Sequence, residues 1–245
     1  MAMALTVLGT GGSYAGPGNA CSGYLVEVDG FRLWMDCGPG TLANLLGHVT
    51  LAEIDAVAIS HSHPDHWLDL PVARNALKYF ERRSGIPLVS TGEVLRLADG
   101  LGHGEGMQPT FTTQAVADGD EVALGPLVLR FSRTDHPVET LAMRVEGGGR
   151  VLAYSADTAA GWSVEAFGPG TDVFLCEASL LPEHRGMAPH VSGAEAGEMA
   201  TAAGVGRLLL THVPPGGDEA PRVEDAATTF SGPTEVVHVN QRYEL

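Results

Sequence analysis

Short apolar runs, separated by glycine or polar segments, dominate the first quarter of the chain. Three of them have the length and aliphatic content of strands: Ala4–Thr10, Gly23–Val28 and Phe31–Asp36. Asp29-Gly30 joins the last two and is a strong signal for a two-residue hairpin turn. A fourth run, Ala56–Ile59, ends in a polar stretch. The pattern predicts a sheet built from the start of the chain.

A helix is predicted shortly after that polar stretch. Four apolar residues give it a buried side at helical spacing: Leu70, Ala73, Leu77 and Phe80. Asp69 is the expected N-cap, and Pro71 lies in the first turn, where its missing N–H costs little. Three basic residues recur at four-residue steps, and we expect them on a solvated face rather than on a phosphate: Arg74, Lys78 and Arg82.

The rest of the chain is strand-like at first and then alternates. Between Leu88 and Ser155 the clearest strands are Leu127–Arg133, Thr140–Glu146 and Arg150–Ser155. Later strands are expected at Val173–Glu177, Arg207–Thr211 and Thr234–Val239, and helices at Gly193–Ala203 and Pro221–Phe230. Ser192 and Glu195 form a capping box before the first of these helices. Strands followed by helices in both halves predict two packed sheets with helices outside. No linker interrupts residues 1–245, so we expect one domain.

The charge balance narrows the range of partners. The chain has 14 Lys and Arg against 30 Asp and Glu, a net charge of −16. Proteins bind the phosphates of nucleic acids with Lys and Arg, so we expect no large nucleic acid as a ligand. A small phosphate ester that reaches a metal in a cleft is still compatible with this charge.

The cysteines and the N-terminal residues indicate a reducing compartment. Cys21, Cys37 and Cys176 are odd in number and form no C-x-x-C pair, which predicts buried thiols rather than disulfides or a Cys-type zinc site. The first residues lack the basic stretch of a signal peptide, and no apolar run approaches the ~18 residues of a membrane span. We therefore expect a cytoplasmic protein that does not enter a membrane.

The chemistry is concentrated in one hexapeptide, His61-Ser-His63-Pro-Asp65-His66. In extended backbone His61 and His63 project to the same side, and after a turn Asp65 and His66 can face the same centre. Imidazole and carboxylate are the ligands that zinc and similar ions prefer. The alternative is a polar surface turn, but this combination of residues favours a metal site.

Three later residues complete the candidate ligand set. His136, Asp157 and His212 each lie just past the end of a predicted strand, as His61 does. A surface histidine or a helix-capping aspartate explains any one of them alone. Equivalent positions for all three favour a common metal site. Four other histidines match no motif, and we expect ordinary surface or packed residues there: His48, His103, His184 and His238.

In this order the motifs resemble the metallo-β-lactamase superfamily over essentially the whole chain. The resemblance implies the α/β class, a four-layer αββα sandwich with a dinuclear site between its sheets. Carried over by position, the first metal would be bound by His61, His63 and His136, the second by Asp65, His66 and His212, with Asp157 bridging both. Asp36 would hold the ligand loop by hydrogen bonds, unless it is only a turn residue before Gly38.

Further segments resemble the ribonuclease Z branch of the superfamily: Leu8–Ser13, Asp36–Thr41, Cys176–Ser179 and Pro189–Ser192. In that branch a glutamate and a histidine protonate the leaving oxygen, which here implies Glu177 and His190. The branch grips tRNA with an arm inserted between the equivalents of His136 and Asp157. Only 21 positions separate these residues here (157 − 136), so the arm is absent.

Armless relatives with this donor pair include cyclic-nucleotide phosphodiesterases. The sequence resembles the atypical class II type of actinobacterial cAMP phosphodiesterase in three segments: Asp172–Ser179, Ser192–Gly197 and Leu208–Pro215. We therefore expect a metal-dependent hydrolase that cleaves a small phosphodiester, a 3′,5′-cyclic nucleotide, to the 5′-nucleotide. Its cofactors would be two divalent ions, Zn²⁺ before Mn²⁺ or Fe²⁺. Asp65 would also help to orient the attacking hydroxide. Relatives in this branch are often homodimers.

Three other functions fit parts of the sequence. One is a ribonuclease Z-like nuclease acting on RNA. Another is a thioester or ester hydrolase of the glyoxalase II or lactonase kind, which shares the ligand set but has no need of a His–Glu donor pair. The third is a metal-holding protein without catalysis. A variant at His190 separates the first two classes, because only phosphodiester cleavage is expected to depend on it.

Overall fold

A computed structural model describes residues 3–102 and 104–245, and its core is two seven-stranded sheets. The first sheet has the order β14-β1-β2-β3-β4-β5-β6 and the second β13-β12-β11-β10-β9-β8-β7. The strands of the first are β1 (Ala4–Gly9), β2 (Gly23–Val28), β3 (Phe31–Cys37), β4 (Ala56–Ala58), β5 (Ile86–Ser90), β6 (Phe111–Ala115) and β14 (Arg242–Glu244). Those of the second are β7 (Glu121–Leu124), β8 (Leu127–Arg133), β9 (Leu141–Gly147), β10 (Arg150–Tyr154), β11 (Val173–Glu177), β12 (Arg207–Thr211) and β13 (Thr234–Val236).

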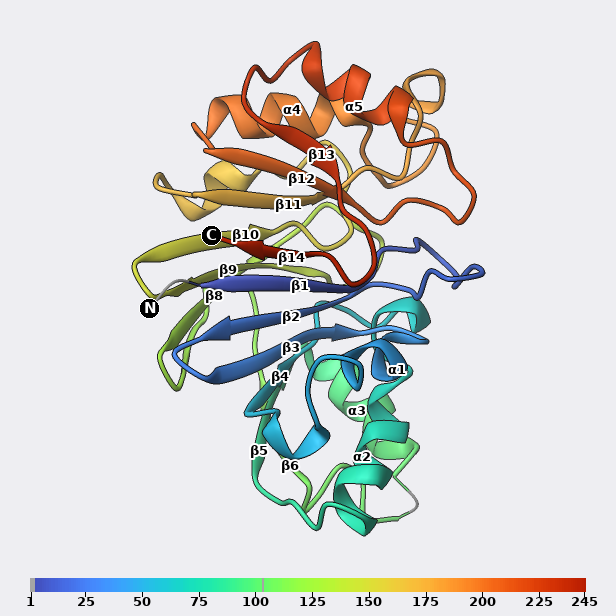
Figure 1. The fold of residues 1–245 in the computed structure, drawn as a ribbon, viewed down its shortest axis with the longest axis vertical. Helices are drawn as coiled ribbons and strands as arrows, with labels where there is room; N and C mark the ends of the chain where they lie inside the picture. Colours follow the sequence, from blue (N-terminus) through green and yellow to red (C-terminus); the bar gives the residue numbers. More distant parts are fainter. Residues whose placement is uncertain (1–2, 103) are drawn as a thin grey trace.

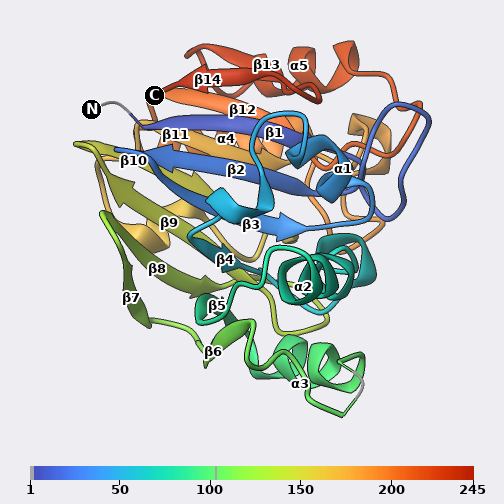
Figure 2. The same ribbon diagram turned by 60° about the horizontal axis from the view of Figure 1, so that its bottom comes forward.

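Helices cover the outer face of each sheet. Figure 1 shows α4 and α5 on one side of the paired sheets and α1 to α3 on the other, and Figure 2 shows the same layers from a second direction. The α-helices are α1 (Thr41–Leu45), α2 (Leu70–Tyr79), α3 (Gly92–Gly100), α4 (Gly193–Ala202) and α5 (Ala220–Ala227). Short 3₁₀ turns are η1 (Leu51–Glu53), η2 (Pro64–His66), η3 (Val164–Phe167) and η4 (Pro182–His184). The predicted αββα sandwich is confirmed.

Three apolar clusters separate these four layers. The central cluster lies between the sheets, where Leu5 and Met35 of the first sheet belong to the same buried group as Met143 and Leu175 of the second. The other two lie between each sheet and its helices. Strands buried on both faces read as nearly continuous apolar runs, which is why their positions were clear in the sequence.

Parallel strands direct the polar loops to one edge of the sandwich. β3, β4, β5 and β6 run parallel in the first sheet, and β10, β11, β12 and β13 run parallel in the second. Ligands of open α/β sheets bind beyond the carboxyl ends of the strands. The candidate residues that follow β4, β10 and β12 are therefore brought to the same edge from both sheets.

The predicted strands agree with the structure to within a few residues, but the helices α1 and α3 and the strand β14 were not predicted. The segment from Leu88 to Ser155 was expected to be mostly strand, yet α3 lies within it. Thr91 caps this helix by accepting a hydrogen bond from the Val94 amide, and Val94 and Ala98 bury one side of it. The capping residue and the four-residue apolar step were visible in the sequence.

The structure changes two details of the helix after the hexapeptide. Asp69 occupies the N-cap position of α2, as predicted, but its side chain does not bond to α2; its Oδ2 accepts a hydrogen bond from the Leu42 amide of α1 at 2.8 Å. Arg74 is buried rather than solvated, and it donates to Glu105 and to the Gln108 carbonyl. Arg82 lies beyond the end of α2, so the three basic residues do not share one helix face.

The three thiols are free and buried, as predicted: Cys21, Cys37 and Cys176. Burial raises the pKa of all three. Within residues 3–102 and 104–245, no helix has the length and apolar content to cross a membrane.

Candidate metal centre

The hexapeptide occupies the connection between β4 and α2, at the edge where the two sheets meet. The η2 turn carries Asp65 and His66, with Pro64 at its first position and His63 at its N-cap. His61 and His66 are fully buried, while His63 is partly exposed. The tight turn thus lets four side chains from six successive residues point inward.

All seven predicted ligands come together in two groups. In each group the nitrogen or oxygen atoms that could bind an ion lie within 4.8 Å of one another. The first group contains His61, His63, His136 and Asp157. The second group contains Asp65, His66 and His212.

Asp157 lies between the two groups. Its Oδ2 is 3.6 Å from His61 Nε2 and 3.9 Å from His136 Nε2, both in the first group. Its Oδ1 is 3.3 Å from the Nε2 atoms of His66 and His212, in the second group. One carboxylate thus presents one oxygen to each group, which is the arrangement expected of a bridging ligand.

Strained backbone surrounds this centre. Ala156, directly before Asp157, has φ 51°, and His212 has φ 57°. Asp36, near the end of β3, has φ 56°. Left-handed φ values are costly for residues with a Cβ, and such residues cluster at functional sites. The fold holds these three residues in unfavourable conformations where the candidate ligands converge.

Two glycines allow loops to approach the ligand residues closely. A Cβ on Gly12 would lie 2.9 Å from the Nδ1 atom of His212. A Cβ on Gly38 would lie 2.0 Å from the carbonyl oxygen of Asp65. The amide of Ser13, next to Gly12 in the chain, donates to Asp65 Oδ2 at 2.8 Å. The glycine-rich loop after β1 therefore helps to fix the second group.

Asp36 is the hub of a buried hydrogen-bond network behind the second group. Its Oδ2 accepts from His66 Nδ1 at 2.7 Å, from the Ser60 hydroxyl at 2.8 Å and from the Tyr154 hydroxyl at 2.9 Å. Its Oδ1 accepts from the Ser60 amide at 2.7 Å. Asp36 therefore holds the ligand loop by hydrogen bonds, as the resemblance implied. Tyr154 was missed, because β10 reads as a plain buried strand.

The histidine tautomers show that this centre fits divalent cations. His66 Nδ1 donates to Asp36, and His136 Nδ1 donates to the Pro189 carbonyl at 3.1 Å, so in the neutral form that binds a metal each ring has its lone pair on Nε2. The His66 and His212 Nε2 atoms nevertheless lie 3.3 Å apart, and His136 Nε2 lies 3.2 Å from His63 Nδ1. Buried His61 Nε2 and Asp157 Oδ1 have no hydrogen-bond partner. Cations between these atoms would relieve the repulsion and satisfy the unpaired groups.

Glu177 and His190 form a pair beside this centre. His190 Nδ1 lies 2.9 Å from Glu177 Oε1, and the glutamate is fully buried at the end of β11. The His190 ring lies 5.5 Å, centroid to centroid, from the rings of His136 and His212. With Nδ1 engaged by Glu177, Nε2 is the nitrogen left for a proton transfer.

The surroundings of His190 favour its protonated form. Burial lowers its pKa, but the hydrogen bond and the charge of Glu177, together with the charges of Asp157 and Asp65, outweigh burial and raise the pKa to about 9. Burial raises the pKa of Asp65, but the close contact with His212 and the charges of His66 and His212 outweigh burial and hold the pKa well below its ordinary value. At neutral pH the structure thus presents a proton donor beside a carboxylate that stays ionised.

His190 also has a second possible use. Together with Asp157 and His212 it forms a third group of atoms that could hold an ion. The first two groups already use Asp157 and His212, and His190 Nδ1 is committed to Glu177. This geometry favours a proton donor over an eighth ligand.

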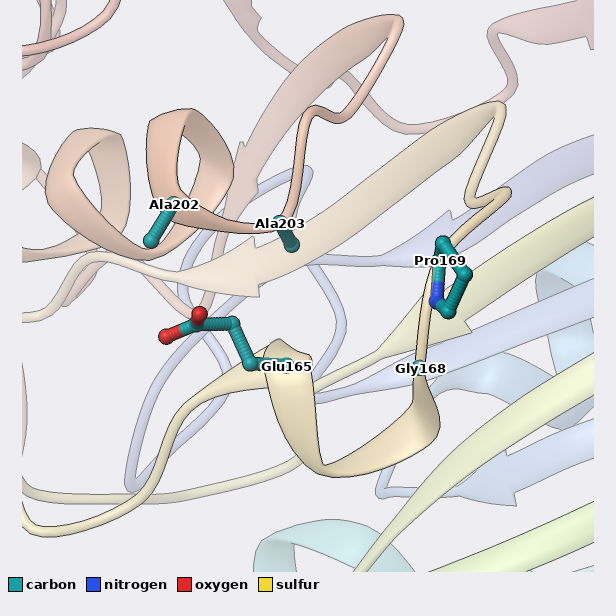
Figure 3. A pocket seen from close by; sticks show the side chains of 5 residues that line it. All are labelled: Glu165, Gly168, Pro169, Ala202 and Ala203. Carbon is teal, nitrogen blue, oxygen red and sulfur yellow. The ribbon is translucent and has the colours of Figure 1, made fainter.

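Three of the four other histidines lie outside this centre, as does the surface pocket of Figure 3. His48 bonds to Asn240, His184 is exposed, and His238 lies 3.6 Å from Glu219; His103 lies outside the described residues. The pocket has a volume of about 240 Å³ and is lined by Glu165, Gly168, Pro169, Ala202 and Ala203 (Figure 3). A single carboxylate among small and apolar residues offers no comparable chemistry.

Comparisons with known proteins agree with this geometry. An uncharacterised protein of Mycobacterium tuberculosis is 36% identical over 252 residues, 98% of this chain and 92% of that protein. The probable metallo-hydrolase YhfI of Bacillus subtilis is 31% identical over 239 residues, 94% of this chain and 95% of that protein. Its crystal structure matches at 28% identity with a TM-score of 0.90 over 100% of both chains. A ribonuclease Z of Mycobacterium bovis is 29% identical over 275 residues, 98% of each chain.

A model described as the β-lactamase superfamily domain matches residues 32–213, which include all seven candidate ligands. That match covers more than half of the chain, and the M. tuberculosis and B. subtilis relatives align along nearly their whole lengths. The chain belongs to the β-lactamase superfamily and is a metallo-hydrolase of that superfamily.

Proposed function

We propose that this protein is a dinuclear phosphodiesterase that hydrolyses a small phosphodiester, a 3′,5′-cyclic nucleotide, to the 5′-nucleotide. The observation that carries the proposal is the buried His190–Glu177 pair beside two groups of metal-binding side chains. Cleavage of a phosphodiester releases an alkoxide that needs a proton. Hydrolysis of a thioester has less need of such a donor, because a thiolate leaves without one.

The ligand roles follow from the two groups. His61, His63 and His136 would hold the first ion, and Asp65, His66 and His212 the second. Asp157 would bridge them, since each of its oxygens faces one group. Two divalent ions, Zn²⁺ before Mn²⁺ or Fe²⁺, supply Lewis acidity and activate a water for attack when they are bound.

The side chains around the ligands have separate tasks. Asp65, kept ionised by its neighbours, accepts a hydrogen bond and so orients the attacking water. His190, held by Glu177, gives the proton at its Nε2 atom to the leaving 3′ oxygen. Glu177 fixes the tautomer of His190 and stabilises its charged form.

The connection between β9 and β10 supports a small substrate. The two strands pair directly from Met143 opposite Tyr154 to Gly147 opposite Arg150, and a turn joins them. No arm can arise from this hairpin to hold a long RNA. The net charge of −16 adds a second reason to prefer a small anion.

A ribonuclease Z-like activity on short RNA is the second candidate. The relative from M. bovis that carries the name ribonuclease Z aligns over 98% of this chain. The His190–Glu177 pair serves either substrate, so substrate size is what separates the two functions. The expected cytoplasmic location and the expected homodimer stay predictions.

One substrate panel at matched metal concentration tests the proposal. The panel contains cAMP, cGMP, a 2′,3′-cyclic nucleotide, an aryl phosphodiester, a precursor tRNA and a thioester. We expect turnover of the cyclic nucleotides and the aryl phosphodiester, and a 5′-nucleotide as the product of cAMP. Faster turnover of the thioester than of every phosphodiester would contradict the proposal, and preference for the precursor tRNA would favour the nuclease.

A further inference from the structure

We propose that Ser179 is a positioning residue that joins the His190–Glu177 pair to His212, and that Arg222 holds Ser179 in place. The role of Ser179 in proton donation rests on the proposed function. Its role in holding His212 concerns metal binding alone and does not depend on that function. Ser179 follows β11, and Arg222 lies in α5.

The Ser179 hydroxyl lies between Glu177, the partner of the proton donor His190, and the metal-binding His212. It is 2.7 Å from Glu177 Oε2 and 2.9 Å from His212 Nδ1. It also lies 3.0 Å from the His212 carbonyl oxygen. The side chain is only half-buried, so these contacts rather than simple burial define its position.

Counting protons gives this link a direction. A serine hydroxyl has one proton to donate, and a carboxylate can only accept. Ser179 therefore donates to Glu177, its shortest contact, and accepts from His212 Nδ1–H. This leaves the lone pair of His212 on Nε2, the atom that faces Asp65 and Asp157 at 3.3 Å.

Glu177 gathers hydrogen bonds from both sides of the centre. Its Oε1 accepts from the Thr158 amide, next to Asp157 in the chain, at 2.7 Å. Ser179 connects its Oε2 to His212, and His190 donates to the same carboxylate. A hydrogen bond from the far nitrogen of a metal-binding histidine fixes the ring and makes its ligating nitrogen more basic. Ser179 therefore serves the second group and the proton donor at once.

Arg222 fixes the backbone on which Ser179 lies. This buried guanidinium donates to the Ala178 carbonyl at 2.6 Å, to the Ser179 carbonyl at 2.9 Å and to the Asp218 carbonyl. Two of these bonds join α5 to a segment more than 40 residues earlier in the chain. A planar, rigid fork suits this task better than the flexible ammonium of a lysine.

Zinc affinity measures the link without any substrate. The Zn²⁺-loaded full chain is titrated with a chromophoric chelator, which gives the affinity of each ion. We expect Ser179→Ala to lower the affinity for one of the two ions about 10- to 100-fold, a typical loss when the hydrogen-bond partner of a ligating histidine is removed. Ser179→Thr keeps the hydroxyl and should retain most of the affinity. Ser163→Ala, which removes a half-buried hydroxyl that caps η3, is the matched control.

A double-mutant cycle tests whether Glu177 acts on the ion through Ser179. Glu177→Gln should weaken the same ion in the parent chain, and this effect should shrink in the Ser179→Ala background. Independent effects of the two substitutions would overturn the link. Unchanged Zn²⁺ affinity in Ser179→Ala, or equal weakening of both ions, would overturn it as well.

Variants of two buried arginines distinguish an effect on the position of Ser179 from an effect on the stability of the whole protein. Arg222→Met should weaken the same ion as Ser179→Ala, whereas Arg144→Met removes a buried arginine that donates to Pro169 and Thr171 and should affect only the melting temperature. A parent-like Zn²⁺ affinity in a folded Arg222→Met would overturn the role of Arg222. Failure of every phosphodiester in the substrate panel would refute the proposed function and leave these affinity results intact.

Discussion

The two groups of metal-binding side chains are held in different ways. In the second group His66 is anchored by Asp36 at 2.7 Å and His212 by Ser179 at 2.9 Å, and Asp65 accepts from the Ser13 amide. In the first group His61 Nδ1 lies 3.0 Å from the Ser60 hydroxyl, which itself donates to Asp36, and His136 Nδ1 bonds to the Pro189 carbonyl of an exposed loop. Asp36 thus holds the second group directly, through His66, and reaches the first only indirectly, through Ser60 and His61.

Asp157 is shared by both groups, so its loss should affect both groups equally. We expect Asp157→Ala to lose both ions and about 10³-fold or more of turnover, because the contribution of the metals, several kcal/mol, disappears. Metal analysis and turnover of an aryl phosphodiester measure this. Asp172→Ala, whose carboxylate binds Arg150 and the Val151 amide, is the control. Two ions per chain in Asp157→Ala would refute the bridge.

His190 lies beside both groups and should affect turnover alone. His190→Ala is expected to lower turnover of cAMP about 10²- to 10⁴-fold, the usual contribution of a positioned acid. Both ions should remain. His184→Ala changes an exposed histidine on the same loop and should leave turnover unchanged. Full activity would show that His190 is not the donor, and loss of one ion would make it a ligand instead.

Asp36 should distinguish the two groups most clearly. Asp36→Asn cannot accept all four hydrogen bonds that the aspartate receives, so we expect the ion of the second group to bind about 10- to 100-fold more weakly. The first group should keep most of its affinity. Tyr154→Phe removes one of these donors and should have a smaller effect. Equal weakening of both ions would contradict the proposed difference.

The pH dependence of turnover tests the link between Glu177 and His190. The pKa of His190 is raised to about 9, so the donor is protonated below that pH and activity should fall as the pH rises through it. Glu177→Gln removes the charge that opposes the effect of burial, so the alkaline limb should move to lower pH. A profile of kcat/KM from pH 6 to 10 measures the shift. An unchanged alkaline limb would show that Glu177 does not set the pKa of the group that titrates there.

Local patterns were enough to predict most elements of the sandwich. Buried strands such as β8, β11 and β12 were predicted at their observed bounds, since continuous apolar runs between polar residues leave few alternatives. α3 was missed because a strand-like neighbourhood obscured its cap at Thr91. Asp69 begins α2 as predicted, but its carboxylate bonds to α1, because a carboxylate can accept from any amide that tertiary packing brings within reach.

The candidate site shows the same division. The hexapeptide and the polar residues after later strands carried enough chemistry to indicate His61, His136, Asp157 and His212. Nothing in the sequence pointed to Arg222 as a support of Ser179, or to Tyr154 as a partner of Asp36. These contacts join residues more than 40 positions apart, and each depends on a particular packing of two elements.

By itself the sequence determined which side chains carry the chemistry and that strand ends present them, because ligand types and apolar periodicity are local properties. The tertiary structure alone decided which atom faces which. It places one Asp157 oxygen on each group and arranges the hydrogen bonds that leave lone pairs on His66, His136 and His212. Tautomers and orientations follow from neighbours that only the meeting of two sheets brings together.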